Sequence, residues 1–273
     1  MHAKRIRITD LKLKKQRGEK ITMLTAYDAM MAGIFDQSGI DALLVGDSVG
    51  MVMLGHNSTL PVTLDDMVHH TAAVSRGSAR ALVIADMPFM TYQVSVAEAV
   101  RSAGRLLQEG AAAAVKIEGG RSVVDVVRRL VEIGIPVMGH LGVLPQSVHQ
   151  MGGYSQQGTD SKQAETMIAD AIVLAEAGAF AIVLESIPGE LAHVITERVN
   201  IPTIGIGAGP DCDGQVLVSS DMLGLGGSVA PPFATQYVNI GDVVKSATRA
   251  YIEDVESGRY PAHIRPTQIT IAK

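Results

Sequence analysis

The sequence predicts a parallel (β/α)8 barrel, the TIM-barrel fold of the α/β class, and three observations support this prediction. Short aliphatic runs alternate with helix-like segments from residue 21 onward. The repeat is about 30 residues long, which is what ~250 residues divided among eight units would give. The runs are almost continuously aliphatic, as expected of parallel strands covered on both faces. An open doubly wound sheet is the alternative, but residues 26–28, after the first run, carry no glycine fingerprint.

Eight strands are expected, and the last has the weakest pattern. They are residues 21–25, 43–45, 81–85, 113–117, 135–139, 180–184, 202–206 and 216–218. Capping residues and glycines mark the helices between them. These helices are expected up to residue 35, from 64 onward, and at 95–109, 122–132, 162–176, 188–199 and 242–256. Two long polar segments, residues 50–63 and 141–159, are expected as loops.

No segment between the repeats has the composition of a linker, so we expect a single barrel domain over residues 1–273. A short helix over about residues 9–17 is expected before the first strand, with Thr9 and Asp10 as its cap and Gly18 at its end. The C-terminal tail, about residues 260–273, fits no motif.

Charge and composition exclude several classes of protein. The formal net charge of -5 implies no basic face for nucleic acid. The single cysteine, Cys212, excludes an internal disulfide and a multi-cysteine metal site, and it suits a reducing cytoplasm. No apolar run approaches the ~20 residues that span a bilayer, and no apolar signal core follows the basic N-terminus. We therefore expect a cytoplasmic protein that acts on small molecules, without nucleic-acid or membrane partners.

Ionisable side chains lie at the ends of several predicted strands, where packing alone has no use for them. In a parallel barrel all strand ends of one kind open onto the same face, so these side chains share one pocket. They are Asp47 with Ser48, Asp86, Lys116 with Glu118, His140 and Glu185. Any one of them could be an ordinary cap or loop residue, but the whole set indicates a functional site.

The three acids Asp47, Asp86 and Glu118 offer only oxygen ligands. Oxygen ligands favour Mg²⁺ over zinc, and Mg²⁺ keeps waters that a substrate can displace. Lys116 lies two residues before Glu118, so both side chains point to the same side of a strand. It could hold a substrate carboxylate, or it could simply balance the charge of the acids.

The remaining strand-end residues are Glu185, His140 and Ser48. Glu185 follows four apolar residues and is a candidate general base, with capping of the helix near Pro188 as the alternative. His140 could orient a ligand or shuttle a proton, or it could be a hydrogen-bonded core histidine. Ser48 has no base nearby in the sequence, so we do not expect a nucleophile there.

Long ordered motifs lie between residues 21 and 260. They are residues 25–28 (TAYD), 44–50 (LVGDSVG), 55–63 (GHNSTLPVT), 85–90 (ADMPFM), 115–120 (VKIEGG), 139–142 (GHLG), 145–147 (PQS), 152–154 (GGY) and 204–209 (IGIGAG). Together these motifs resemble those of the ketopantoate hydroxymethyltransferase family. The resemblance implies a barrel of the phosphoenolpyruvate/pyruvate type that assembles as a homodecamer. It also implies transfer of a hydroxymethyl group from 5,10-methylenetetrahydrofolate to 3-methyl-2-oxobutanoate, giving 2-dehydropantoate for pantothenate biosynthesis.

The same resemblance assigns roles to the strand-end residues. It implies that Mg²⁺ is bound by Asp47, Asp86 and Glu118, and that Glu185 is the catalytic base that forms an enolate. The residues implied to bind substrate are Asp47, Ser48, Asp86, Lys116 and His140.

Two other classes of function remain open. A lyase or mutase on the same type of barrel would be expected to carry an acid, often a cysteine, after strand four or five, whereas Cys212 follows strand seven. A metal- or phosphate-binding barrel without turnover would leave Glu185 unexplained.

Overall fold

The computed structural model describes residues 4–226 and 231–261. The chain divides into two compact units, one ending at Ser219 and the other beginning at Ser220. The single domain predicted over residues 1–273 therefore stays a prediction, and most of the predicted tail, about residues 260–273, lies outside the described residues. We describe each unit by itself.

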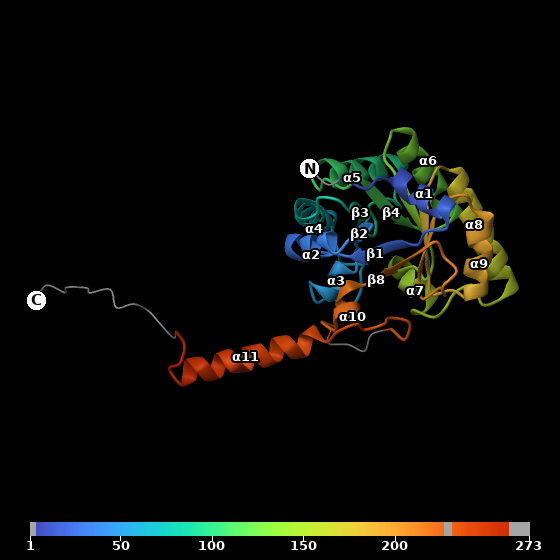
Figure 1. The fold of residues 1–273 in the computed structure, drawn as a ribbon. Helices are drawn as coiled ribbons and strands as arrows, with labels where there is room; N and C mark the ends of the chain where they lie inside the picture. The colour runs from blue at the N-terminus through green and yellow to red at the C-terminus, as the bar shows by residue number, and fades with distance from the viewer. Residues whose placement is uncertain (1–3, 227–230, 262–273) are drawn as a thin grey trace, which may run out of the picture. The chain divides into compact units, whose positions relative to one another are not determined.

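The first unit contains a closed barrel of parallel strands, which confirms the predicted (β/α)8 fold (Figure 1). The strands follow one another around the barrel in sequence order, and the last pairs with the first. The closing register sets Ile21 opposite Gly214 and Leu24 opposite Leu217. The strands are β1 (Ile21–Thr25), β2 (Ala42–Val45), β3 (Leu82–Asp86), β4 (Ala114–Glu118), β5 (Val137–Gly142), β6 (Ala181–Glu185), β7 (Thr203–Ile206) and β8 (Gly214–Leu217).

Helices connect successive strands up to β7 and surround the barrel (Figure 1), whereas residues 207–213 join β7 to β8 without a helix. Their starts are encoded locally: the Thr63 side chain accepts a hydrogen bond from the Asp66 N–H while Asp66 accepts one from the Thr63 N–H, a reciprocal cap. The connecting helices are α2 (Ala29–Gln37), α3 (Val49–Val52), α4 (Leu64–Gly77), α5 (Val96–Gln108), α6 (Val124–Glu132), α7 (Val148–Met151), α8 (Ser161–Glu176) and α9 (Gly189–Arg198), with 3-10 helices η1 (Arg121–Val123) and η2 (Pro145–Ser147).

Two expectations about local structure need correction. The N-terminal helix, α1 (Ile8–Arg17), begins before Thr9, so Arg7 occupies the N-cap position and Asp10 lies inside the first turn. The short helices α3 and α7 lie largely in segments predicted as loops, because glycines near them suggested irregular structure.

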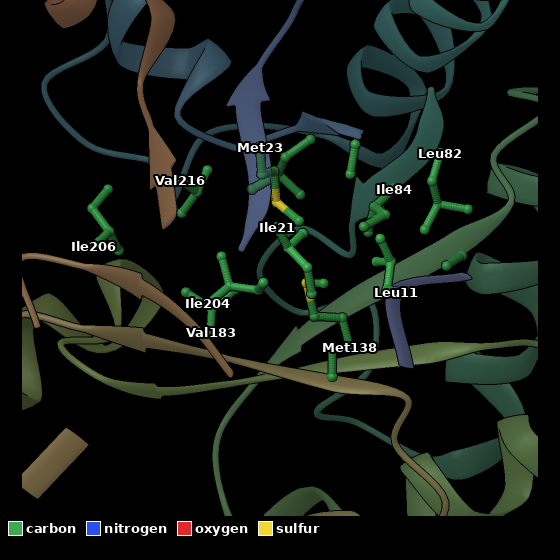
Figure 2. Close-up of a cluster of buried hydrophobic side chains, with 14 residues drawn as sticks. Leu11, Ile21, Met23, Leu82, Ile84, Met138, Val183, Ile204, Ile206 and Val216 are labelled. Atoms are coloured by element: carbon green, nitrogen blue, oxygen red, sulfur yellow. The ribbon is translucent and has the colours of Figure 1, made fainter. Parts of the chain in front are cut away.

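Apolar side chains fill the interior of the barrel and form its core (Figure 2). Leu11 of α1 belongs to this cluster and is fully buried, so α1 closes the N-terminal end of the barrel. The other members are Ile21, Met23, Ala42, Leu44, Leu82, Ile84, Ala114, Met138, Ala181, Val183, Ile204, Ile206 and Val216.

Two acids at the N-terminal end of the barrel follow the same bonding pattern. Asp41 Oδ2 accepts hydrogen bonds from the N–H and hydroxyl of Thr22 and lies 2.6 Å from Lys14 Nζ. Asp213 Oδ2 accepts the corresponding two bonds at the start of β7 and lies 2.7 Å from Lys15 Nζ. Each acid therefore has its own lysine from α1 and its own pair of neutral donors.

The second unit begins within α10 (Ser219–Leu223) and contains α11 (Ile240–Glu256). The Asn239 side chain caps α11 by accepting a hydrogen bond from the Asp242 N–H. None of the described helices combines the length and apolarity needed to cross a membrane.

Candidate active site

The C-terminal ends of β2 to β6 bring the predicted site residues to one rim of the barrel. Asp86 and Glu185 are the last residues of β3 and β6, and Asp47 follows β2 by two positions. Parallel strands in register place these ends side by side, so the placement follows from the topology that the sequence predicted. Asp86, Lys116, Glu118 and His140 are all buried, as is Asp47.

The three predicted metal-ligand acids lie in mutual electrostatic contact. Asp86 Oδ2 accepts a hydrogen bond of 3.0 Å from the Asp47 N–H. Burial, together with the charges of Asp86 and Glu118, raises the pKa of Asp47 well above its ordinary value. Burial also raises the pKa of Asp86, whereas donors around Glu118 outweigh its burial and lower its pKa. The cluster therefore holds more negative charge than its own surroundings neutralise.

Lys116 is the one cation inside this cluster of acids in the described residues. Its Nζ lies 3.2 Å from Asp86 Oδ1 and 3.0 Å from His140 Nδ1. Burial lowers its pKa, but the charges of Asp86, Glu118 and Asp47 more than offset this and raise the pKa overall, so the ammonium stays charged. This ion pair agrees with one of the two roles considered for Lys116, which is to balance the charge of the acids. The other role, binding of a substrate carboxylate, stays a prediction.

His140 connects the lysine to the predicted base. Because the charged Lys116 can only donate, His140 Nδ1 accepts from it, and in a neutral ring the proton then lies on Nε2. That Nε2 lies 3.2 Å from Glu185 Oε2. His140 is thus buried and hydrogen-bonded, as a core histidine would be, and it also faces the carboxylate of Glu185.

Glu185 lies at the edge of the buried cluster, with 21% of its side chain exposed. It does not cap the following helix, because α9 has Pro188 at its N-cap position and no side-chain cap bond. The alternative role considered for Glu185 is therefore not observed. Gly142 at the end of β5 has φ +100° and packs against the Glu185 carbonyl, where a Cβ atom would collide. This close approach fixes the backbone that carries Glu185.

Ser48 lies beside the acids and makes a contact that the sequence did not predict. The Tyr27 hydroxyl and Ser48 Oγ are 2.8 Å apart. Burial raises the pKa of Tyr27 to about 12, so the phenol keeps its proton and can donate it to Ser48. A Cβ atom on Gly46 would lie 2.6 Å from Ser48 Oγ, so glycine makes room for this hydroxyl.

The site also contains two residues that sequence reasoning missed, Gln146 and Tyr92. Gln146 donates from Nε2 to Asp47 Oδ2 at 2.8 Å and from its backbone N–H to Glu118 Oε2 at 3.0 Å. Tyr92 donates its hydroxyl proton to Gln146 Oε1 at 2.7 Å. Gln146 lies within a motif used for the family resemblance, but nothing in the motif shows that the side chain turns inward.

The oxygen donors of the site fit a divalent cation. Glu118 Oε1 is buried and has no hydrogen-bond partner in the part of the chain that the structure describes, and Asp86 Oδ1 has only its ion pair with Lys116 at 3.2 Å. A cation would satisfy these oxygens and reduce the repulsion among the acids. Within residues 4–226 and 231–261, no three His, Cys, Asp or Glu side chains are placed so that together they could hold a metal ion. Mg²⁺ needs only one or two carboxylates, with water and substrate oxygens completing its shell, so the three-carboxylate ligand set stays a prediction.

Comparisons with known structures find barrels of the same fold, one of them a member of the PEP mutase/isocitrate lyase superfamily. A 2,3-dimethylmalate lyase of that superfamily aligns with a TM-score of 0.58 and 20% identity, over 96% of this chain and 91% of that one. A phosphoenolpyruvate phosphomutase from Streptomyces platensis subsp. rosaceus aligns with a TM-score of 0.61 and 12% identity, over 95% and 92%. At these identities the likeness concerns the fold alone.

Comparisons of sequence are more specific. A model of the family described as ketopantoate hydroxymethyltransferase matches residues 5–263. The 3-methyl-2-oxobutanoate hydroxymethyltransferase of Syntrophus aciditrophicus is 56% identical over 247 residues, which cover 90% of this chain and 91% of that protein. The protein of the same name from Clostridium kluyveri is 57% identical over 247 residues, 90% of this chain and 88% of that protein.

Proposed function

The chain belongs to the ketopantoate hydroxymethyltransferase family, and we propose that its one-carbon donor is 5,10-methylenetetrahydrofolate and that its reaction passes through an enolate. As a member of that family it is a transferase of the pantothenate pathway, and its relatives' names give 3-methyl-2-oxobutanoate as the acceptor. The product is then 2-dehydropantoate. The mechanistic part of the proposal rests on one observation: Glu185, whose carboxylate is partly exposed, faces a buried cluster of acids across His140.

Binding of the 2-oxo acid is assigned to the rim of the barrel. Ser48 and Lys116 hold the substrate carboxylate, supported by the charge of Lys116 and by the polarisation of Ser48 through Tyr27. Asp47, Asp86 and Glu118 would hold Mg²⁺, which would polarise the substrate ketone and stabilise negative charge on its oxygen. His140 completes the substrate-binding set.

Proton removal from C3 is assigned to Glu185. The carboxylate takes the C3 proton, and the electron pair of the C–H bond moves toward the ketone. His140, held by Lys116 on its other nitrogen, orients the Glu185 carboxylate through Nε2. Overall, C3 bonds to the methylene carbon, water supplies the hydroxyl group, and both carbon–nitrogen bonds from that carbon to the folate break. The two folate nitrogens take up the C3 proton and one proton from water, so tetrahydrofolate leaves.

The decisive experiment measures two reactions of the purified protein with Mg²⁺. The first is formation of 2-dehydropantoate from 3-methyl-2-oxobutanoate and 5,10-methylenetetrahydrofolate. The second is exchange of the C3 hydrogen in D₂O, followed by NMR, which reports proton removal without the folate. We expect both reactions in the wild-type protein and a loss of about 10²–10⁴-fold in both for Glu185→Gln.

Full exchange and turnover by Glu185→Gln would remove Glu185 as the base. Exchange by the wild-type protein without turnover would retain the enolate and reject the folate donor. Cleavage of a 2-methylisocitrate-like acid in place of transfer would support the lyase alternative.

We also propose that the protein works in the cytoplasm as a homodecamer. The single cysteine supports a reducing compartment, and the family resemblance supports the decamer. Light scattering on the purified protein measures the assembly, and a monomer or dimer would reject it.

A further inference from the structure

Gln146 makes contacts in the site that the mechanism above does not use. It lies in η2, on the loop after β5, and only 5% of the residue is exposed. Its Nε2 donates to Asp47 Oδ2 at 2.8 Å and to the Met87 carbonyl at 3.0 Å. Its Oε1 accepts from the Tyr92 hydroxyl at 2.7 Å and from Gln93 Nε2 at 3.1 Å. All four hydrogen-bonding positions of the amide are therefore filled.

These four partners fix the orientation of the Gln146 amide. If the amide were flipped, its oxygen would face the Asp47 carboxylate and the Met87 carbonyl, both of which are acceptors. Its nitrogen would then face the Gln93 amide nitrogen. The buried amide thus has one arrangement in which every partner is satisfied, and in that arrangement it donates to Asp47.

The backbone of Gln146 holds a second acid of the cluster. Its N–H donates to Glu118 Oε2 at 3.0 Å, so one residue engages one oxygen of Asp47 and one of Glu118. These acids follow β2 and end β4, and Asp86 ends β3 between them. The other oxygen of Glu118, Oε1, is buried and has no hydrogen-bond partner in the described residues.

The chemistry of an amide suits this position. A carboxylate in place of Gln146 would add a further negative charge to a cluster that already has an excess. An aliphatic side chain would leave Asp47 Oδ2 without its donor. Glutamine supplies a neutral donor, and it reaches two acids on different strands at the same time. Outer-shell partners of this kind orient metal-binding carboxylates, and their loss typically costs 10–100-fold in metal affinity or activity.

We propose that Gln146 is a positioning residue, which holds the Asp47 and Glu118 carboxylates in place so that oxygens of this acid cluster, together with water and substrate, bind a divalent cation. The inference rests on the proposed function, because it assigns Gln146 to the cation site of that reaction. Gln146 acts through the acids and does not touch the substrate.

The test uses Gln146→Met in the full-length protein. Methionine keeps the approximate volume and the backbone N–H to Glu118, but it removes the donor to Asp47. Mn²⁺ is the probe, and free Mn²⁺ is counted by electron paramagnetic resonance without substrate. We expect Gln146→Met to bind Mn²⁺ about 10–100-fold more weakly than wild type. Gln156→Met changes an exposed glutamine of the same loop and should bind Mn²⁺ as wild type does.

Two further measurements separate positioning from a loss of folding. The thermal midpoint and circular dichroism of Gln146→Met should resemble those of wild type, and saturating Mn²⁺ should restore much of its C3 exchange rate. If the variant does not fold, Tyr92→Phe takes its place: it removes the hydroxyl that holds Gln146 Oε1, and a few-fold weakening of Mn²⁺ binding is expected.

The outcomes distinguish this inference from the proposed function. Equal Mn²⁺ affinity of a folded Gln146→Met variant and wild type would overturn the role of Gln146, as would a wild-type protein that turns over but binds no Mn²⁺. Weakened binding in the variant, with no hydroxymethyl transfer by wild type, would support the role of Gln146 and reject the transferase mechanism.

Discussion

Buried acids have opposite surroundings at the two ends of the barrel. At the N-terminal end, Asp41 and Asp213 each have a lysine of their own, Lys14 and Lys15, and each also accepts two neutral hydrogen bonds. At the C-terminal end, three acids surround Lys116, and the buried Oε1 of Glu118 lacks a hydrogen-bond partner in the described residues.

This difference in pairing distinguishes acids that stabilise the fold from acids that serve the reaction. A paired and hydrogen-bonded acid lowers the free energy of the folded state when it is charged, whereas crowded buried acids raise it. The pKa of Asp47 is accordingly raised, while that of Asp36, which receives several N–H donors near the start of β3, is lowered. Functional sites commonly retain such unfavourable charge at a cost in stability.

The largest effect is expected from Asp47→Asn at the C-terminal end. Activity should fall on the order of 100-fold or more, because a proposed cation ligand loses its charge. The free energy of unfolding at neutral pH should stay the same or rise. The folded-state pKa of Asp47 lies above its unfolded value, so stability tied to its protonated form is lost as pH rises through the folded pKa. Turnover and urea unfolding measure the two effects. Lost stability with retained activity would contradict the conclusion that Asp47 serves activity and not stability.

At the N-terminal end, Asp213→Ala should have the reverse effect. Removal of the partner of Lys15, in a pair with about 15% of each side chain exposed, should cost about 2–3 kcal/mol of unfolding free energy. Activity per folded molecule should not change. Asp125→Ala is the control, because Asp125 pairs with Arg128 at 2.8 Å on the exposed surface. This pair should contribute less than about 0.5 kcal/mol to the free energy of unfolding. Equal losses in both variants would show that the N-terminal pairing has no special role.

Asp36→Asn tests the comparison through the pH dependence of stability. Burial raises the pKa of Asp36, but the N–H groups of residues 79–81 and the Ser78 hydroxyl outweigh it and lower the pKa. Its stabilisation is present above the unfolded pKa of about 3.9 and is lost as pH falls through the lower folded pKa. We expect a cost of about 2 kcal/mol at pH 7 that shrinks below about pH 4. Urea unfolding at both pH values measures it, and a cost that does not change with pH would contradict the assignment.

The smallest effect is expected from Tyr27→Phe. Loss of one neutral hydrogen bond to Ser48, worth about 1 kcal/mol, should raise KM for the 2-oxo acid roughly fivefold and leave kcat nearly unchanged. Tyr237→Phe, at a residue 75% exposed, is the control. A fall in kcat with no change in KM would mean that Tyr27 acts on the reacting atoms and not through Ser48.

The sequence predicted the barrel because its signals are local. Aliphatic runs and caps such as Thr63 are readable one segment at a time, and all eight strands were found. The last strand has the weakest pattern, and it begins at Gly214 where residue 216 was expected. Gln215 is exposed and the strand is short, so its pairing with β1 and β7 defines it more than its own pattern does.

The site was predicted to the extent that it lies on strand ends. Asp47, Asp86 and Glu118 share a rim because parallel topology requires it. Gln146 and Tyr92 could not be found in this way, since both lie on loops that fold back over the rim. A glutamine in a polar loop normally faces solvent, and only the tertiary structure shows that this one is buried.

The pairing of Lys15 with Asp213 joins residues that are 198 positions apart, and β1 is likewise paired with β8. During synthesis, α1 and β1 leave the ribosome first and their partners leave late. Until β8 is available, the sheet has two open edges, and open edges are the part of a β-protein that associates with other chains. Closure of the barrel and docking of α1 therefore occur together and late. We therefore expect the yield of native protein to depend on how fast this last step follows synthesis, because a slow step leaves the strand edges exposed for longer.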